Sequence, residues 1–331
     1  MYHYLRGFYL SANVLKCLVP SLIFIALCLI FVTGLGGLGV ESIRYNAASE
    51  NNSLPSDVND ENTAVIPEEP SMAEKVTRAL VEAYPRRVLR TEFRDGDWAV
   101  LLRDTWFYYA EGRLLPEEIR HRALEFRPVG FYQYPKDLPE WKHPTDEQIS
   151  RYRAMGDTVQ PARANYFFDA LYRASSHSEA DQRVKTIRFL GNSITVHYAI
   201  IEDLVLVEEA IRAAARTSLQ VGNWVQNIGS MESWHWRDVA GTQSRSFHSY
   251  GIALDILPRS YQRKQVYWRW AGSEWWNIPY EDRYQPPDAV VKIFEAHGFV
   301  WGGKWAIYDT IHFEYRPDVL LLSGINLTTM R

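Results

Sequence analysis

Two short polar motifs in the C-terminal part of the chain place the tightest constraint on its fold. His248 and Asp255 flank a glycine, Gly251, while Asp309 and His312 follow much later in the chain. Two histidines and one carboxylate are a complete set of protein ligands for a catalytic Zn²⁺ that keeps one coordination position for water. The motifs therefore predict a zinc site, and the fold must bring the two segments together to form it.

Gly251 explains how His248 and Asp255 can reach the same point. On one continuous strand they would face opposite sides, because side chains alternate with a period of two. A tight turn at Gly251 places His248 on a loop and Asp255 in a strand over residues 252–257, on the same face as the small Ala253. The alternative is a buried aspartate bonded to a core histidine. We favour the metal, because a carboxylate in an apolar strand is costly unless it is paired or metal-bound.

The second motif predicts a strand over residues 310–316, in which His312, Glu314 and Arg316 share one face. Asp309 stands where this strand begins and can reach the site to handle the proton of the water molecule. Glu314 could itself be a ligand. We favour a role in the surroundings of the metal, where it orients a ligand or anchors substrate.

Charge and cysteine usage exclude several classes of function. The formal net charge of -4 provides no basic surplus to neutralise phosphates, so we expect no nucleic-acid partner. Both cysteines, Cys17 and Cys28, lie in an apolar N-terminal segment. The chain after residue 40 therefore has no thiol nucleophile and no intrachain disulfide.

The N-terminal segment over residues 17–40 contains no charged side chain. As a helix it would be about 36 Å long, enough to cross a hydrocarbon core of about 30 Å. Arg6 and Lys16 precede it, so the positive-inside bias keeps residues 1–16 in the cytoplasm and exports the rest. We expect a single-pass protein of the cell membrane with a periplasmic or extracellular C-terminal domain. A cleaved signal peptide is the alternative.

Composition divides the exported part into three regions. Residues 41–72 are rich in Asn, Ser, Asp, Glu and Pro and are predicted to be a disordered acidic linker. Residues 73–175 are predicted to form a small α+β extension of unknown role, with a hairpin built from residues 98–102 and 106–109. Residues 176–331 are predicted to form the domain that holds the zinc site.

The last region also contains both kinds of secondary structure. Two strand patterns over residues 184–190 and 194–198 predict a second hairpin around Gly191. Apolar periodicity predicts helices over residues 204–215 and 289–297. The predicted fold class is therefore α+β, with a small antiparallel sheet flanked by helices.

Both polar motifs resemble sequence blocks of the VanY/VanX-type D-alanyl-D-alanine carboxypeptidase family. Residues 246–255 are similar to its S-x-H-x-x-G-x-A-x-D signature, and residues 298–314 to its block G-F-x-W-G-G-x-W followed by D-x-x-H-F-E. This family of zinc peptidases includes L-alanyl-D-glutamate endolysins and shares its fold with the Hedgehog signalling domain. The resemblance covers roughly residues 180–320 and implies that fold here, while residues 41–175 have no recognised counterpart.

By position, the resemblance implies that His248, Asp255 and His312 bind Zn²⁺ and that Asp309 is the general base. Some members of the family have glutamate at the place of Asp309, and aspartate also occurs among endolysin relatives. The identity of this residue therefore leaves the cleaved bond open.

Other positions are assigned to the substrate. The resemblance implies that Arg237 is a catalytic and substrate-binding residue, which holds a carboxylate or polarises a carbonyl, although Arg245 is a competitor. It also implies that Ser246 lines the site. Among the tryptophans, Trp305 is the best candidate for a residue of the cleft. The insertion over residues 259–276 is rich in Arg, Tyr and Trp and forms either a lid or packing.

Together these features predict a membrane-tethered zinc peptidase that hydrolyses peptidoglycan stem peptides. Release of a terminal D-alanine is the first expectation, and an endopeptidase that cuts within the stem is the alternative. Another class also remains: a binding module for the cell wall that keeps the fold and the zinc without turnover. A third interpretation is a tethered scaffold whose function lies in residues 73–175.

Overall fold

The computed structural model describes residues 69–155 and 161–328. The predicted cytoplasmic N-terminus, the membrane helix over residues 17–40 and the acidic linker up to residue 68 lie outside these residues. Within the described part of the chain, no helix is both long enough and apolar enough to cross a membrane. Membrane attachment through residues 17–40 stays a prediction.

The described chain begins with a helix that packs on a four-stranded antiparallel sheet. Ser71 starts the helix, because its side chain accepts a hydrogen bond from the amide of Glu74. The pairing of the second and third strands confirms the first predicted hairpin. The elements are α1 (Met72–Ala83), β1 (Val88–Arg94), β2 (Asp97–Leu102), β3 (Thr105–Ala110) and β4 (Arg113–Pro116).

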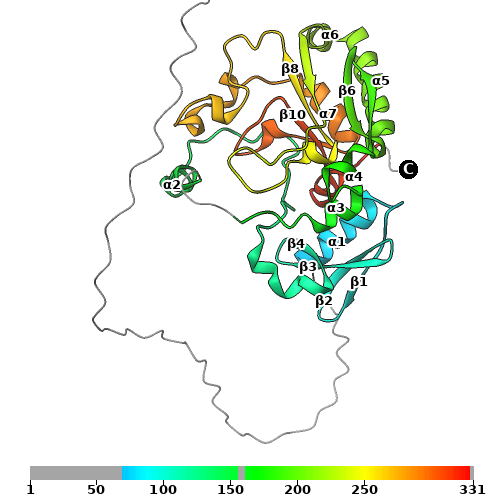
Figure 1. Ribbon diagram of the computed structural model, residues 1–331. Coiled ribbons are helices and arrows are strands. Elements are labelled where there is room, and N and C mark those ends of the chain that lie inside the picture. Colours follow the sequence, from blue (N-terminus) through cyan, green and yellow to red (C-terminus); the bar gives the residue numbers. More distant parts are fainter. Residues whose placement is uncertain (1–68, 156–160, 329–331) are drawn as a thin grey trace, which may run out of the picture. The chain divides into compact units, whose positions relative to one another are not determined.

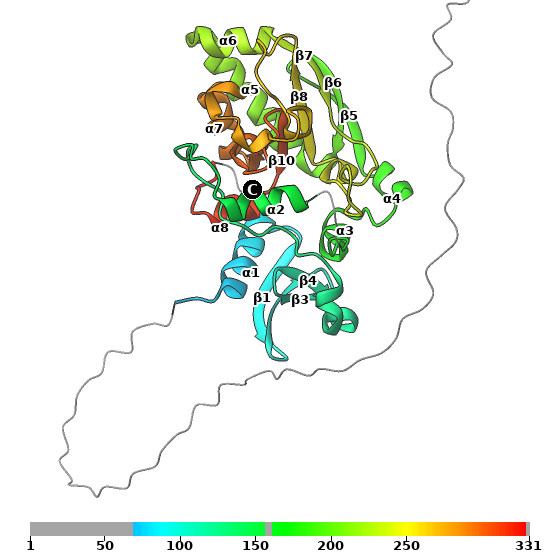
Figure 2. The same cartoon turned by 90° about the vertical axis from the view of Figure 1, so that its left-hand side faces the viewer.

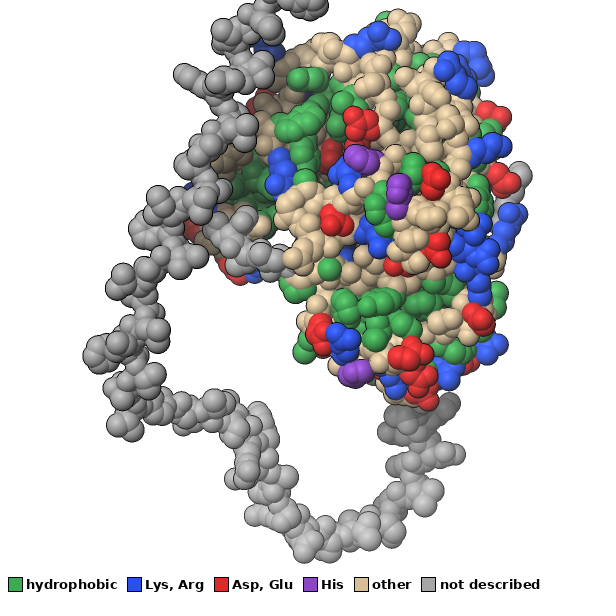
Figure 3. Space-filling model, in the orientation of Figure 1, with side chains coloured by type: hydrophobic (Ala, Val, Ile, Leu, Met, Phe, Trp, Pro, Cys, Tyr) green, Lys and Arg blue, Asp and Glu red, His purple; other side chains and the backbone are tan. Residues whose placement is uncertain are grey.

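One side of this sheet carries exposed apolar side chains. Phe93 is 63% exposed, and Leu124 in the following 3-10 helix η1 (Glu117–Glu125) is 79% exposed. Figure 3 shows hydrophobic side chains gathered where Figure 1 places β3 and β4, while acidic and basic side chains are interspersed on the rest of that face.

Helices and a hairpin connect this sheet to the next. The hairpin confirms the second predicted one, and a helix with Leu204, Val207 and Ile211 buried confirms the amphipathic helix expected over residues 204–215. The elements are α2 (Asp146–Ala154), α3 (Tyr166–Tyr172), α4 (His177–Asp181), β5 (Val184–Phe189), β6 (Asn192–His197), α5 (Ile201–Thr217) and α6 (Leu219–Gln226).

A second four-stranded antiparallel sheet carries both polar motifs. Its strand order is β7-β8-β10-β9, so the two motif-bearing strands β8 and β10 are central neighbours. Helix α7 covers this sheet, and the ring of its Phe294 stacks on Phe313 at 4.1 Å between centroids. The elements are β7 (Ile228–Glu232), β8 (Ala253–Pro258), α7 (Asp288–Ala296), β9 (Phe299–Trp301), β10 (His312–Tyr315) and α8 (Pro317–Leu322).

One hydrophobic core joins the early elements to the late ones. The same cluster of buried side chains contains Val76 and Leu80 of α1, Phe167 of α3, and Phe294 and Phe313 next to the second sheet. Figures 1 and 2 show α1 beside the red helix α8 in both views. The domain boundary near residue 175 stays a prediction.

Buried polar contacts reinforce this junction. Tyr84 at the end of α1 donates a hydrogen bond to Asp318, whose carboxylate also pairs with Arg316. The buried side chains of Glu295 and Lys304 form an ion pair that lies against the segment over residues 134–136. Such groups are stable inside a protein only when each is paired, so these contacts fix the segment in one position.

The described residues therefore form a mixed α+β structure with small antiparallel sheets and helices, as predicted.

Candidate metal centre

The register between β8 and β10 places Asp255 and His312 directly opposite each other. Their side chains lie on the same face, and His312 Nδ1 is 2.9 Å from Asp255 Oδ1. The next pair on that face is Glu314 and Ala253. The small side chain of Ala253 leaves the space beside the two polar residues that the alternation predicted.

The third member of the site, His248, comes from the 3-10 helix η3 (Phe247–Tyr250) just before β8. Gly251 ends η3 with a φ of +69°, and a Cβ there would lie 2.8 Å from the amide nitrogen of His197. Both the left-handed backbone and the close approach require glycine. The predicted turn is therefore present, and it brings His248 to the face that carries Asp255.

A hydrogen bond fixes the orientation of the His248 ring. Its Nδ1 donates to the carbonyl of Ser233 at 2.6 Å, which leaves Nε2 as the nitrogen with a free lone pair. This Nε2 lies 3.3 Å from Asp255 Oδ1 and 3.3 Å from His312 Nδ1. The three side chains thus point one donor atom each at a common centre.

The spacing of these atoms fits a tetrahedral metal ion. Ligand atoms about 2.0–2.1 Å from zinc in a tetrahedral site lie about 3.3–3.4 Å from one another. The three observed separations, between 2.9 and 3.3 Å, are close to that value. Among the described residues, these three make up the cluster of potential metal ligands. Two imidazoles and one carboxylate are also the donor types that zinc prefers.

Glu314 contacts the second ring nitrogen of His312, the one that does not face Asp255. Its Oε2 lies 3.1 Å from His312 Nε2, on the side of the ring opposite Asp255. Burial alone would lower the pKa of His312, but its hydrogen bonds with Asp255 and Glu314 outweigh burial and raise the pKa well above its usual range. The buried carboxylate of Glu314 and the partly buried one of Asp255 therefore favour a positive charge at this point, whether a proton or a metal ion supplies it.

Asp309 lies at the rim of the same centre. Its backbone amide donates to the carbonyl of Gly302 at 3.0 Å, while its buried Oδ1 has no hydrogen-bond partner among the described residues. Burial raises the pKa of Asp309 to about 6, although the nearby His312 acts in the opposite direction. A carboxylate with an unused oxygen and a pKa close to neutrality is suited to accept and return a proton.

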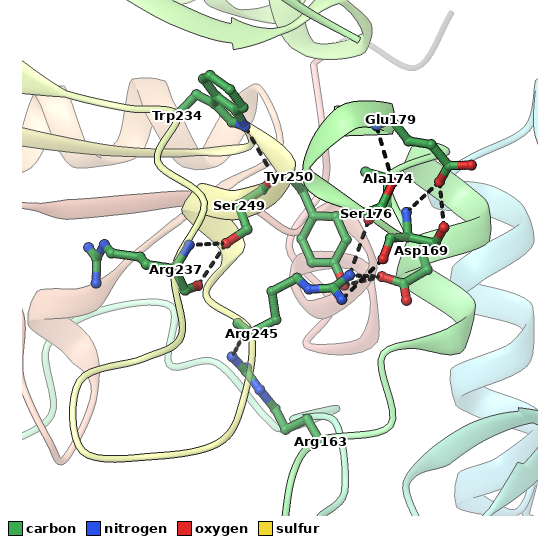
Figure 4. A network of polar contacts seen from close by, with 11 residues as sticks. Arg163, Asp169, Ala174, Ser176, Glu179, Trp234, Arg237, Arg245, Ser249 and Tyr250 are labelled. Atoms are coloured by element: carbon green, nitrogen blue, oxygen red, sulfur yellow. Dashed lines mark hydrogen bonds and ion pairs between the residues drawn. The ribbon is translucent and has the colours of Figure 1, made fainter. Parts of the chain in front are cut away.

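Arg237 is held through its backbone, which leaves its side chain free. Its amide donates to Ser249 Oγ at 2.9 Å, and Ser249 Oγ donates back to its carbonyl at 2.7 Å. Figure 4 shows the guanidinium pointing away from the surrounding polar network. It forms no hydrogen bond or ion pair with any described residue.

Arg245, the competing arginine, is held by several contacts. Its guanidinium pairs with Asp169 of α3, donates to the carbonyl of Ala174 at 3.1 Å and lies 4.5 Å above the ring of Trp236. Asp169 also accepts a hydrogen bond from Tyr250 at 2.7 Å (Figure 4). This arginine therefore anchors the loop that begins at Arg237, and its charge is already paired with a carboxylate.

The structure also positions the other two predicted site residues. Ser246 is buried, and its hydroxyl accepts a hydrogen bond from the amide of His248 at 3.3 Å. The ring centroid of Trp305 lies 5.4 Å from that of His312, and its Nε1 donates to the hydroxyl of Tyr132 at 2.8 Å. Contact with substrate stays a prediction for both residues.

Sequence reasoning missed the residues that hold the site from outside the two motifs. Ser249, Asp169 and Tyr132 each fix a residue of the site by a hydrogen bond or an ion pair. Asp169 and Tyr132 belong to the region predicted to be an extension without chemistry. No local pattern marks them, because their roles depend on contacts with distant parts of the chain.

Comparison with protein families identifies the class of protein. A family model described as D-alanyl-D-alanine carboxypeptidase matches residues 240–315, which contain every predicted metal ligand. The match supports a peptidase of a family related to peptidoglycan. Residues 240–315 belong to the VanY-type family, which confirms the resemblance of the two motifs.

The match is shorter than the resemblance, which extended roughly from residue 180 to residue 320. A second model, of a domain of unknown function, matches residues 76–131, which include most of α1 and the whole first sheet. No solved structure matches the chain.

Proposed function

We propose that this protein is a zinc-dependent D-alanyl-D-alanine carboxypeptidase acting on peptidoglycan stem peptides. The observation that carries the proposal is the convergence of His248 Nε2, Asp255 Oδ1 and His312 Nδ1 at mutual distances of 2.9–3.3 Å. Zinc at such a site would supply Lewis acidity, which acidifies a water molecule and polarises the scissile carbonyl. Membership of a peptidase family supports this chemistry.

Asp309 is proposed to be the general base. Its free Oδ1 would accept a proton from the attacking water, and the same carboxyl would then give the proton to the leaving amine. A pKa near 6 suits both directions, because the group can be charged before the transfer and neutral after it.

Glu314 is proposed to orient His312 rather than to bind the metal. Its contact is with Nε2, so Nδ1 stays directed at Asp255 and His248. A carboxylate on the second nitrogen also makes the imidazole more basic and fixes its orientation.

Arg237 is proposed to bind the substrate. Its guanidinium is free, whereas that of Arg245 is paired with Asp169. A guanidinium can hold a carboxylate by two charge-assisted hydrogen bonds, or it can stabilise charge on a carbonyl oxygen.

An endopeptidase that cuts within the stem peptide is the second candidate. The observation that favours it is the aspartate at position 309, a choice also found among endolysin relatives. A binding module without turnover is less favoured, because the ligand set and the acidic group at its rim are both intact.

Export and tethering are proposed on separate grounds. They rest on the uncharged segment over residues 17–40 and on the basic residues Arg6 and Lys16 before it. Protease protection in intact cells, compared with permeabilised cells, would test them without reference to the activity.

Mass spectrometry of digested muropeptides tests the function directly. The full-length, zinc-loaded protein is incubated with pentapeptide and tetrapeptide stems. Loss of one terminal D-alanine from the pentapeptide is the expected result, and release of a fragment from within the stem would identify the endopeptidase instead. If both stems stay intact at every enzyme concentration, the binding module becomes the better explanation.

A further inference from the structure

The insertion over residues 259–276 contributes a tyrosine to the rim of the metal centre. The backbone of Tyr267 pairs with that of Asp309 in an isolated antiparallel bridge. The two hydrogen bonds of this bridge run from Thr310 to Val266 at 2.8 Å and from Trp268 to Tyr308 at 3.2 Å. Tyr267 and Asp309 exchange no backbone hydrogen bond with each other, so they are a non-hydrogen-bonded pair.

This type of pair brings side chains closest together. In antiparallel strands, the Cα atoms of such a pair lie about 4.5 Å apart and both side chains project to the same side. The phenol of Tyr267 therefore projects on the same side as the proposed general base. Tyr267 is half-buried, so its hydroxyl end can contact a ligand.

Two arginines surround this phenol. Burial raises the pKa of the Tyr267 phenol, and the nearby positive charges of Arg269 and Arg237 act in the opposite direction. Arg269 also donates to the carbonyl of Ala240 at 2.6 Å, which connects the insertion to the loop that carries Arg237. A phenol can donate its proton to an anion, and two positive charges close by favour an anion at this point.

The insertion is a rigid wall and not a loose loop. Its own Trp275 and Trp276 are buried in one cluster with Tyr308, and Tyr152 of α2 packs on Trp275 at 4.8 Å between ring centroids. A hydrogen-bond donor carried by this wall is held in place before any ligand arrives. Such preorganisation lowers the entropic cost of binding.

We propose that Tyr267 is a specificity residue. With the positive charge of Arg269 close to it, Tyr267 binds the C-terminal carboxylate of the peptide substrate, and this carboxylate then lies next to Asp309. The inference rests on the proposed function and deepens it, because it names the substrate group that this wall recognises. A phenol proton and a guanidinium charge bind a carboxylate more strongly than an amide, because the amide carbonyl can accept the same hydrogen bond but carries no charge. The wall would thus favour a carboxypeptidase over an endopeptidase.

The test uses Tyr267→Phe in the full-length chain and two matched peptides. One is acetyl-L-lysyl-D-alanyl-D-alanine with a free carboxylate, and the other is its C-terminal amide. KM and kcat are measured with zinc, and calorimetry on chelator-treated protein gives the Kd of both peptides without hydrolysis. Tyr261→Phe, an exposed tyrosine of the same insertion, is the matched control.

Wild-type protein is expected to bind the acid at least about 10-fold more tightly than the amide, because a hydrogen bond to a charged group is lost in the amide. Tyr267→Phe should remove most of this preference, raise KM for the acid by a similar factor and keep the zinc content. Tyr261→Phe should behave as wild type.

Three outcomes would overturn the inference: no acid preference in the wild type, an unchanged preference in Tyr267→Phe, or loss of zinc in that variant. The calorimetric arm separates the two proposals. If the protein binds the acid more tightly than the amide and this preference depends on Tyr267, the inference is supported even when neither peptide is hydrolysed. The lack of hydrolysis would then count against the proposed activity and not against the role of Tyr267.

Discussion

His312 lies directly opposite Asp255 across strands β10 and β8, with 2.9 Å between Nδ1 and Oδ1. Strand pairing sets this distance, so no loop has to move to bring the two donors together. His248 joins them from η3 through a turn that requires Gly251. A site held by two central strands is more precise than one built on loops, and it needs little rearrangement to bind a metal ion.

Zinc analysis tests this arrangement. The full-length protein is expected to hold about one zinc ion per chain, because the three donors complete the protein part of one tetrahedral site. His248→Ala should lose it, since only two ligands remain. His121→Ala removes an exposed histidine of η1 and should keep it. Full zinc occupancy in His248→Ala, measured by elemental analysis, would refute the assignment.

Glu314→Gln tests the role of the second carboxylate. Glutamine keeps the size and can still accept from His312 Nε2, but it removes the charge that makes the imidazole basic. We expect zinc affinity to fall roughly 10- to 100-fold, measured by competition with a chelator. Glu118→Gln at an exposed position is the control. Complete loss of zinc would instead indicate that Glu314 is a ligand.

Asp309→Asn separates proton transfer from metal binding. The amide cannot accept the proton of the attacking water, so hydrolysis should fall about 10²- to 10⁴-fold while zinc stays bound. Asp104→Asn, at an exposed turn, should keep wild-type rates. The measurement is kcat on muropeptides together with zinc content. Near wild-type turnover in Asp309→Asn would assign the base to another group.

Asp169→Asn tests the anchor of the Arg237 loop. The change leaves Arg245 mostly buried without its carboxylate, so the free energy of unfolding should fall by about 2 kcal/mol in urea. KM should also rise, because the loop that carries Arg237 loses one of its attachments. Glu208→Gln breaks the more exposed pair with Arg212 and should cost less than about 1 kcal/mol. Equal losses in both variants would contradict this role for Asp169.

His197 makes stability depend on pH. Burial lowers the pKa of its imidazole from an ordinary 6.5 to about 4, and both ring nitrogens are engaged: Nε2 donates to the carbonyl of Tyr172, and Nδ1 accepts from the amide of Ala199. Between pH 4 and 6.5 the unfolded chain therefore binds more protons than the folded one. Stability should fall as pH drops through that window, by about 3 kcal/mol in total.

The matched comparison isolates this effect from other titrating groups. His197→Gln should show a shallower loss of unfolding free energy between pH 6.5 and 4 than wild type, whereas His177→Gln, at an exposed position, should follow wild type. Identical slopes for wild type and His197→Gln in urea titrations would show that His197 does not titrate differently on folding.

Local patterns predicted the elements of the site and the faces of its strands. Alternation correctly placed His312 with Glu314, and Asp255 with Ala253, and Gly251 correctly marked the turn after His248. These properties depend on residues a few positions apart, so periodicity and backbone preference are enough to predict them.

The sequence alone determined which chemistry this chain can support, because the ligand types and their spacing are local facts. Tertiary structure decided which residues meet. Strand pairing places Asp255 opposite His312 and Tyr267 opposite Asp309. The ion pair between Asp169 and Arg245 engages one arginine of the loop, while the guanidinium of Arg237 stays free. These pairs join segments far apart in the chain. Which segments pair depends on strand register and on packing in the shared core. Neither property can be read from a short stretch of sequence.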